Sequence, residues 1–216
     1  MNSTLNSQNY IAKGNAPWFS NNWLDINKVI SMNKLDSGTT VVCDGSVTNM
    51  TEMFRNCNEL TSIDLSNFDA SNVVYMSGMF YYCFRITALD LSNFDTSKVK
   101  DMGYMFYNCS NLTKLDLSNF DTSNVTEMSV MFSNCYELTT LDLSNFDTSN
   151  VKYMEGMFYN CTRLTTIKGI IDMKSCNDFN DMFKRCTKLK DVKIKNPPPD
   201  FEIISGLSKS QYTIVS

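Results

Sequence analysis

Histidine is absent from this 216-residue sequence, and glycine and proline are scarce, with 8 and 4 copies. Without histidine, the chain forms no Ser-His-Asp or Cys-His nucleophile system and no histidine-ligated zinc site. It also lacks a glycine-rich phosphate-binding loop, so we expect no cofactor. No apolar run approaches the roughly 18 residues of a membrane-spanning helix, so no membrane insertion is expected. The first ten residues lack the charged and apolar regions of a signal peptide.

The composition indicates a folded chain that does not bind nucleic acid. Hydrophobic residues make up 43% of the sequence, enough for a core. The formal net charge is −4 and the pI is about 4.9. Nucleic-acid binding requires a basic surface, which this balance disfavours.

A block of about 26 residues recurs through the middle of the chain. Its clearest mark is a column of cysteines spaced by 26 residues, with a last step of 25: Cys57, Cys83, Cys109, Cys135, Cys161 and Cys186. Such a period is typical of one structural unit stacked on itself. Stacked repeats usually present a binding surface and seldom house a catalytic centre.

Each repeat has two halves, as residues 112–138 show. Residues 112–120 have leucines at strand spacing, and the FDTSN turn that follows contains residues that cap or bend the backbone. In residues 125–135 apolar side chains recur every three or four positions, which predicts one face of a short helix. The fold class is therefore α/β: a solenoid of strand–turn–short-helix units with one parallel sheet.

Three regions follow from the pattern. Residues 1–45 form an N-terminal cap, with a helix expected over 18–32 and a first strand over 39–43. Residues 46–195 form the six-repeat solenoid. Residues 196–216 contain three consecutive prolines, which cannot continue a strand ladder, and are expected to cap the C-terminal end.

Positions that stay nearly constant between repeats are expected to form the core. The methionine column (Met76, Met102, Met128 and Met154) is interpreted as flexible core filler rather than a metal or cofactor stripe. The cysteine column is interpreted as buried free thiols. Neighbouring coils would bring cysteines within disulfide range, so a bridge stays an alternative. A zinc site is disfavoured because no C-x-x-C motif occurs, and we expect no metal.

Two acidic columns stand out. The first occupies the same outward position of each strand and is a candidate site for a cation or basic partner: Asp64, Asp90, Asp116 and Asp142. Carboxylates about 5 Å apart repel each other, and a cation would relieve the repulsion. The alternative is a solvated polar face helped by Lys114 and serines. The second column, at Asp69, Asp95, Asp121 and Asp147, is expected to cap the turn backbone, beside an asparagine hydrogen-bond ladder.

The variable columns lie in the second half of the repeat and are rich in aromatic residues. Exposed tyrosine often anchors protein interfaces. The candidate partner surface consists of Tyr81, Phe84, Tyr104, Tyr107, Tyr136 and Tyr159. The alternative is that these rings pack on their neighbours in the stack.

The string LDLSNFDTSNV followed by MF and NC motifs resembles the BspA-like leucine-rich-repeat proteins of bacterial surfaces and the overlapping Mycoplasma-type lipoprotein repeat family of unknown function. The resemblance covers residues 46–195. It implies a leucine-rich-repeat-like solenoid without enzyme activity. It also implies surface display or secretion, adhesion, and binding of host or matrix proteins. It carries no defined site residues.

We therefore expect a non-enzymatic module for protein–protein recognition or adhesion, displayed on a bacterial surface or secreted, with a protein or glycan partner. The alternative is a structural scaffold or effector that acts inside a cell or in a larger surface or phage-derived assembly. An enzyme using the acidic column as paired carboxylates is disfavoured, because equivalent repeated positions do not give two carboxylates different environments.

Overall fold

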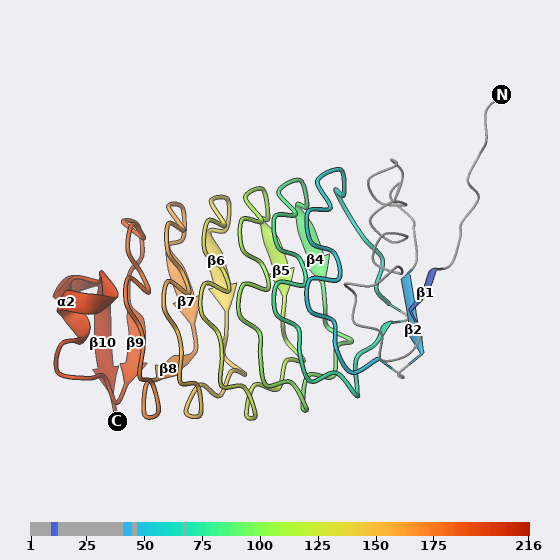
Figure 1. The fold of residues 1–216 in the computed structure, drawn as a ribbon. Helices are drawn as coiled ribbons and strands as arrows, with labels where there is room; N and C mark the ends of the chain where they lie inside the picture. The colour runs from blue at the N-terminus through green and yellow to red at the C-terminus, as the bar shows by residue number, and fades with distance from the viewer. Residues whose placement is uncertain (1–9, 13–40, 45–46, 67) are drawn as a thin grey trace.

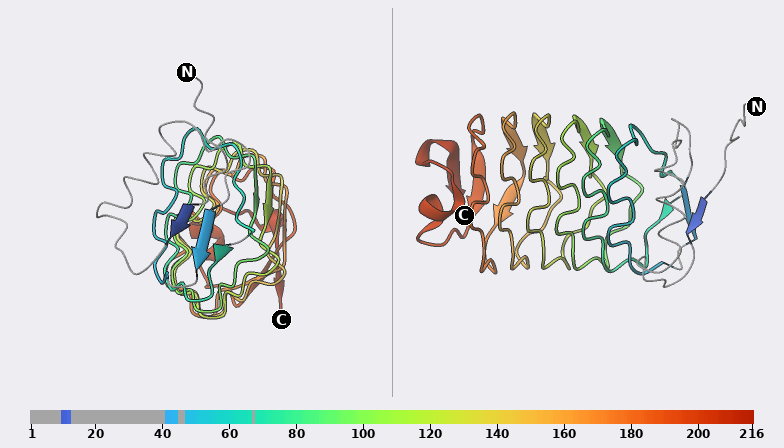
Figure 2. Two further views of the ribbon diagram at one scale, coloured as in Figure 1. Left: turned by 90° about the vertical axis from the view of Figure 1, so that its right-hand side faces the viewer. Right: turned by 45° about the horizontal axis from the view of Figure 1, so that its top comes forward.

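The chain winds into a stack of coils, one for each repeat (Figure 1). The computed structural model describes residues 10–12, 41–44, 47–66 and 68–216. Viewed along the stack, the coils superpose around a common interior (Figure 2). The predicted solenoid is confirmed, whereas the helix expected over residues 18–32 lies outside the described residues.

The described coils contain short parallel strands. They are β1 (Tyr10–Ala12), β2 (Val41–Asp44), β3 (Phe68–Asp69), β4 (Ala88–Asp90), β5 (Lys114–Asp116), β6 (Thr140–Asp142), β7 (Thr166–Lys168), β8 (Ile170–Asp172), β9 (Val192–Lys195) and β10 (Tyr212–Val215). All pairings are parallel, as predicted. The strands fall into four hydrogen-bonded groups rather than one sheet: β1-β2-β3, β4-β5, β6-β7 and β8-β9-β10.

The half of the repeat expected to be a short helix is instead a succession of turns. In residues 125–135, the N–H of Met131 donates to the carbonyl of Met128, as in a turn. The N–H groups at the alternating positions donate to the next coil, as Val130 does to the carbonyl of Glu155 at 2.7 Å. Val130 itself has a left-handed backbone, with φ of 61°. The apolar spacing correctly identified the buried face, but not the backbone conformation.

The spacing of the coils explains this difference. An α-helix with its side chains is about 10–12 Å wide, whereas hydrogen-bonded strands lie about 4.8 Å apart. The core phenylalanines of successive coils stack with ring centroids 5.2–5.8 Å apart, as Phe80 does on Phe106. Because the coils are this close, α-helices at the same position of successive coils would not fit side by side. Turns that exchange hydrogen bonds between coils satisfy the backbone instead.

The side of the stack formed by these turns, which we call the turn side, contains a ladder of parallel bridges that runs through successive coils. Its members are Asn49, Tyr75, Asp101, Glu127, Tyr153 and Asp178. The bridges join every neighbouring pair in this column, including the coils that carry β5 and β6. The turn ladder therefore holds the coils together where the strand ladder is interrupted.

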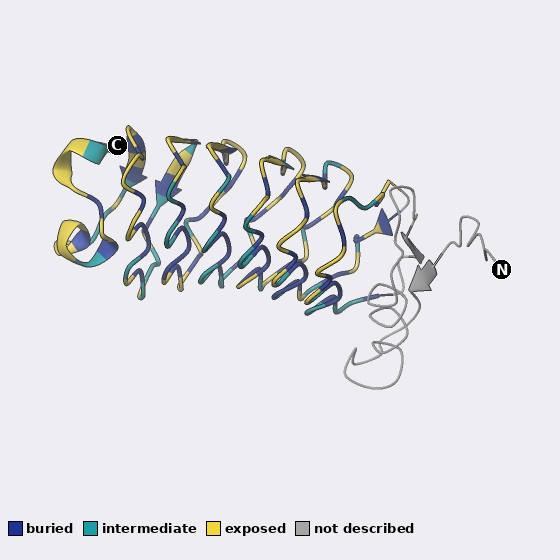
Figure 3. Ribbon diagram, turned by 90° about the horizontal axis from the view of Figure 1, so that it is seen from above, coloured by how far each residue is buried: buried dark blue, intermediate teal, exposed yellow. Residues whose placement is uncertain are grey.

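The core is one cluster of buried leucine, valine, methionine, phenylalanine and cysteine side chains. Buried residues recur in the successive coils along the stack (Figure 3). The six cysteines of the repeat column are free and buried, which matches the interpretation as core thiols. Most of their thiols also donate hydrogen bonds to backbone carbonyls of the preceding coil. The Sγ of Cys109 donates to the carbonyl of Phe80 at 3.2 Å, and Cys135 does the same to Phe106.

Polar side chains also link coils inside the turns. The predicted asparagine ladder is present: the amide of Asn145 donates to the carbonyls of Leu117 and Phe120. A threonine ladder, which the sequence patterns did not predict, lies beside it. The buried hydroxyl of Thr122 donates to the carbonyl of Asp147 and accepts from its N–H. The second aspartate column caps the turns as expected, as Asp121 does by accepting from the N–H of Ser123.

The C-terminal residues pack on the last coil. Helix α2 (Phe201–Ser205) is followed by a 3-10 turn (Lys209–Gln211) and by β10, which pairs with β9. Phe201 lies 6.0 Å from Phe179, and the carbonyl of Ser205 accepts from the N–H of Phe183. The segment thus continues both the strand ladder and the turn ladder at this end.

Candidate interaction surfaces

Four tyrosines from two adjacent coils gather on the turn side. Tyr81 stacks on Tyr107 with ring centroids 5.0 Å apart. Tyr82 contacts both rings, at 4.8 and 5.4 Å, and Tyr104 lies 6.2 Å from Tyr81 and 6.0 Å from Tyr107. Tyr81 and Tyr107 are half-buried, whereas Tyr82 and Tyr104 are 37% and 44% exposed. We call these four residues the tyrosine cluster.

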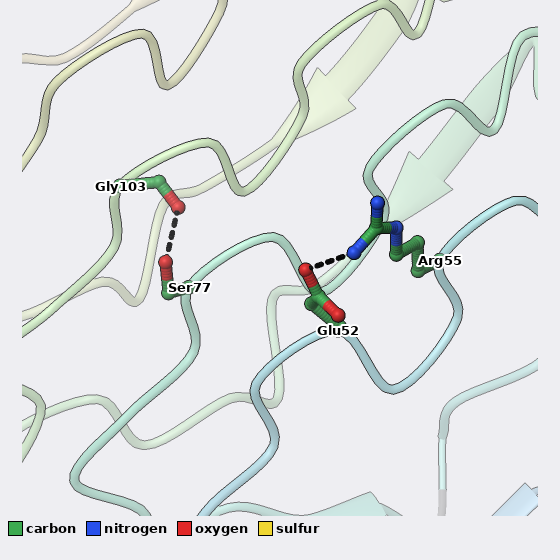
Figure 4. Close-up of polar contacts among 4 residues, drawn as sticks. All are labelled: Glu52, Arg55, Ser77 and Gly103. Carbon is green, nitrogen blue, oxygen red and sulfur yellow. Dashed lines mark hydrogen bonds and ion pairs between the residues drawn. The ribbon is translucent and has the colours of Figure 1, made fainter. Parts of the chain in front are cut away.

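A charged pair borders the tyrosine cluster on the preceding coil. The guanidinium of Arg55 lies 4.8 Å from the centre of the Tyr81 ring and forms an ion pair with Glu52 (Figure 4). The hydrogen bond to Glu52 raises the pKa of Arg55. Burial raises the pKa values of Tyr81 and Tyr107, so both phenols stay neutral near neutral pH. The rings of Tyr81 and Tyr107 are therefore neutral and lie beside an arginine–glutamate ion pair.

The structure brings together only part of the aromatic set that the sequence singled out. Tyr81, Tyr104 and Tyr107 are in the tyrosine cluster. Ser133 occupies the next coil in the same column, so Tyr159 stands apart from the cluster, 5.7 Å from the guanidinium of Arg185.

The other two predicted aromatics, Phe84 and Tyr136, are exposed on the loop that follows each cysteine. The hydroxyl of Tyr136 donates to the side chain of Asn134 at 3.2 Å. The interpretation that rings pack on stack neighbours holds for Tyr81 and Tyr107, while the outer rings keep open faces.

The sequence patterns missed Tyr82, which completes the tyrosine cluster. Four coils have asparagine in this column: Asn56, Asn108, Asn134 and Asn160. All of these positions have positive φ, which asparagine tolerates and tyrosine disfavours. A bulky residue in a column of asparagines was therefore the signal that could have found it.

The strand-side aspartates accept hydrogen bonds from backbone N–H groups two residues further along the chain. The Oδ1 atom of Asp90 accepts from the N–H of Ser92, and Asp116 accepts in the same way from Ser118. Hydrogen bonds from Ser92 lower the pKa of Asp90. The pKa of Asp142 is lowered to about 2 by hydrogen bonds from Ser144 and by Lys168, whose Nζ lies 3.0 Å away. Within the described ranges, no three acidic or thiol groups converge as metal ligands.

A groove opens on the strand side, over β4 and β5 and toward the end of β6. Its volume is about 700 Å³. Leu89, Leu115 and Leu117 supply its apolar wall. Acidic residues, one lysine and small polar residues make up the rest of its lining: Asp90, Asp116, Asp142, Lys114, Ala88, Ser118, Ser144 and Asn145. Three of the four predicted strand-side aspartates therefore border one groove, whereas Asp64 lies outside it.

Parallel coils joined by two ladders, around an unbroken apolar interior, define a solenoid repeat protein. The chain belongs to the family described as "Mycoplasma protein of unknown function, DUF285", which matches residues 18–89 and 83–196. This match confirms the family resemblance of the repeats. Among solved structures, the chain is similar to a leucine-rich-repeat protein of T. pallidum, at 19% identity and a TM-score of 0.46, over 74% of this chain and 81% of that one. No curated protein matches the chain.

Across the part of the chain that the structure describes, we find no helix with the length and apolar character needed to cross a membrane. Solenoid repeat folds commonly serve as interaction modules, because their stacked coils display an extended surface.

Proposed function

We propose that this protein is a non-enzymatic recognition module, displayed on a cell surface or secreted, that binds a protein partner through the tyrosine cluster. The observation that carries the proposal is the strained backbone beneath the two exposed rings. Tyr82 and Tyr104 have φ of 62° and 58°, in the left-handed region that tyrosine rarely adopts. Such a conformation costs on the order of 1–2 kcal/mol for each residue.

The fold does not require tyrosine at either position. The column of Tyr104 has glycine in two other coils, Gly78 and Gly156, with the same positive φ. The column of Tyr82 has asparagine in four other coils. Two aromatic side chains are thus kept in adjacent coils at a cost to stability, which favours a role in binding rather than in folding.

The chemistry of the tyrosine cluster suits a protein partner. Tyrosine offers a large contact area with few rotatable bonds, so little entropy is lost when it binds. The half-buried rings of Tyr81 and Tyr107 support the exposed pair, and the Arg55–Glu52 pair supplies polar contacts at the border. A rigid aromatic centre with a polar border is typical of binding hot spots.

The test replaces the exposed rings with residues that other coils already use. We expect the double variant Tyr82→Asn, Tyr104→Gly to fold like the wild type, because both replacements suit a positive φ. Immobilised wild type is first screened against arrays of matrix proteins and glycans. For each partner that binds, the double variant should weaken the affinity at least about tenfold.

The matched control is Val130→Gly. Val130 occupies the column of Tyr104 at φ of 61°, so the change relieves the same backbone strain without removing an aromatic ring. This control should bind as the wild type does. Equal binding by the double variant and the wild type would refute the role of the tyrosine cluster. Capture of glycans alone would show that the partner class is wrong.

A further inference from the structure

The groove over β4 and β5 reaches an interruption in the strand ladder, between β5 and β6. In the neighbouring strand pairs, the N–H of Leu91 donates to the carbonyl of Asp116 at 3.3 Å, and Leu143 donates to Lys168 at 3.0 Å. Among the described residues, Leu117 makes no equivalent bond to Asp142. The two coils therefore separate on the strand side, while the bridge between Glu127 and Tyr153 keeps them joined on the turn side.

This separation uncovers part of the core. The central residue is buried in the other strands of the repeat series, with exposed fractions of 3% for Leu89, 2% for Leu141 and 4% for Ile167. Leu115, at the same position of β5, is only partly buried and lies in the wall of the groove. An apolar side chain of a partner could pack on the surface of Leu115 that the missing strand pairing leaves exposed.

The charge around this apolar wall is mainly negative. Asp90 and Asp116 are paired in the register of β4 and β5, so their carboxylates lie on adjacent strands about 4.8 Å apart. Neither carboxylate has an ion pair with a described residue, whereas Asp142 is neutralised by Lys168. Lys114 is the single basic residue of the lining. Two like charges side by side are stabilised by a cation between them.

We propose that this groove binds an extended peptide segment of a partner protein through a lysine or arginine side chain. The aliphatic stem of that side chain packs on Leu115, and its charged group lies between Asp90 and Asp116. Lysine and arginine combine an apolar stem with a terminal cation, which matches an apolar wall with acidic residues at its border. A bare metal ion would leave the leucine wall without a partner.

The test uses a fluorescein-labelled peptide of alternating lysine and threonine, with binding followed by fluorescence anisotropy. The double variant Asp90→Asn, Asp116→Asn removes the charge but keeps the oxygen that accepts from the serine N–H. It should bind the peptide about tenfold more weakly than the wild type, for the loss of two charge contacts.

The matched control is Asp95→Asn, Asp121→Asn. These aspartates also accept from serine N–H groups in turns, and the net charge changes equally, but they lie outside the groove. This control should keep the affinity within about twofold. Lys114→Thr should tighten binding about threefold, because it removes the competing cation. Threonine already occupies the equivalent positions 140 and 166.

Three results would overturn the proposal. They are an absence of peptide binding by the wild type, equal weakening in the two double variants, and equal binding of a glutamate–threonine peptide. Equal weakening would show that only the overall negative charge attracts the peptide. Circular dichroism and urea unfolding of each variant establish that it is folded, so a lost affinity reports on the groove. The tyrosine cluster is untouched in all of these variants.

Discussion

The threonine ladder should contribute strongly to stability, and Thr122→Val measures that contribution. Valine has nearly the same shape but lacks the hydroxyl. In the wild type, the Thr122 hydroxyl donates to the carbonyl of Asp147 at 2.9 Å and accepts from its N–H at 2.8 Å. The change leaves both backbone groups without a partner. Each unsatisfied group costs about 1–3 kcal/mol when buried. Because Asp147 is exposed to water, we expect the lower end for each group, about 2 kcal/mol in total.

Urea unfolding followed by circular dichroism is the assay, and the midpoint should fall while the slope stays unchanged. The control is Thr113→Val. The Thr113 hydroxyl makes one hydrogen bond, to the carbonyl of Thr87, and its side chain is exposed. That change should cost less than about 0.5 kcal/mol. A cost below about 1 kcal/mol for Thr122→Val, or equal costs for the two variants, would refute the proposed role of the ladder.

Two further predictions concern the core thiols and the glycine backbone. Burial raises the pKa of the Cys135 thiol to about 12, so the folded state retains a proton that the unfolded chain releases near pH 8.5. Stability should therefore fall as the pH rises from about 9 toward 12, and an unchanged urea midpoint between about pH 7 and pH 10 would contradict this. Gly169→Ala would place a Cβ 2.5 Å from the carbonyl oxygen of Leu143 at φ of +99°, which should cost at least about 3 kcal/mol. Gly156→Ala, whose nearest neighbour is 3.6 Å away, should cost only about 1 kcal/mol in thermal unfolding, and equal losses would contradict the steric argument.

The repeat period was enough to predict a solenoid with parallel strands and to assign its buried columns. It was not enough to assign the backbone of the turn half. Apolar residues at positions 128, 131, 132 and 135 are equally compatible with a helix face and with turns of three residues. The choice depends on the distance between coils, which is a property of the stack and not of one repeat.

The candidate surfaces were likewise only partly predictable from the sequence. Tyr81 and Tyr107 share a sequence column, so their contact could be predicted from the period. Tyr82 belongs to a different column, and only the structure shows that its ring lies 5.4 Å from that of Tyr107 on the next coil. The acidic column was visible in the sequence, but the groove beside it depends on a missing strand pairing.

The sequence alone determined what repeats: which columns are apolar, which cap turns, and which vary between coils. These assignments are local, because a side chain's polarity and spacing fix the face it presents. The tertiary structure decided how closely the coils stack, and from this followed the turns in place of helices, the threonine ladder, the tyrosine cluster and the groove at Leu115. Hydrogen bonds between coils couple residues about 26 positions apart, and no single repeat contains both partners of such a bond.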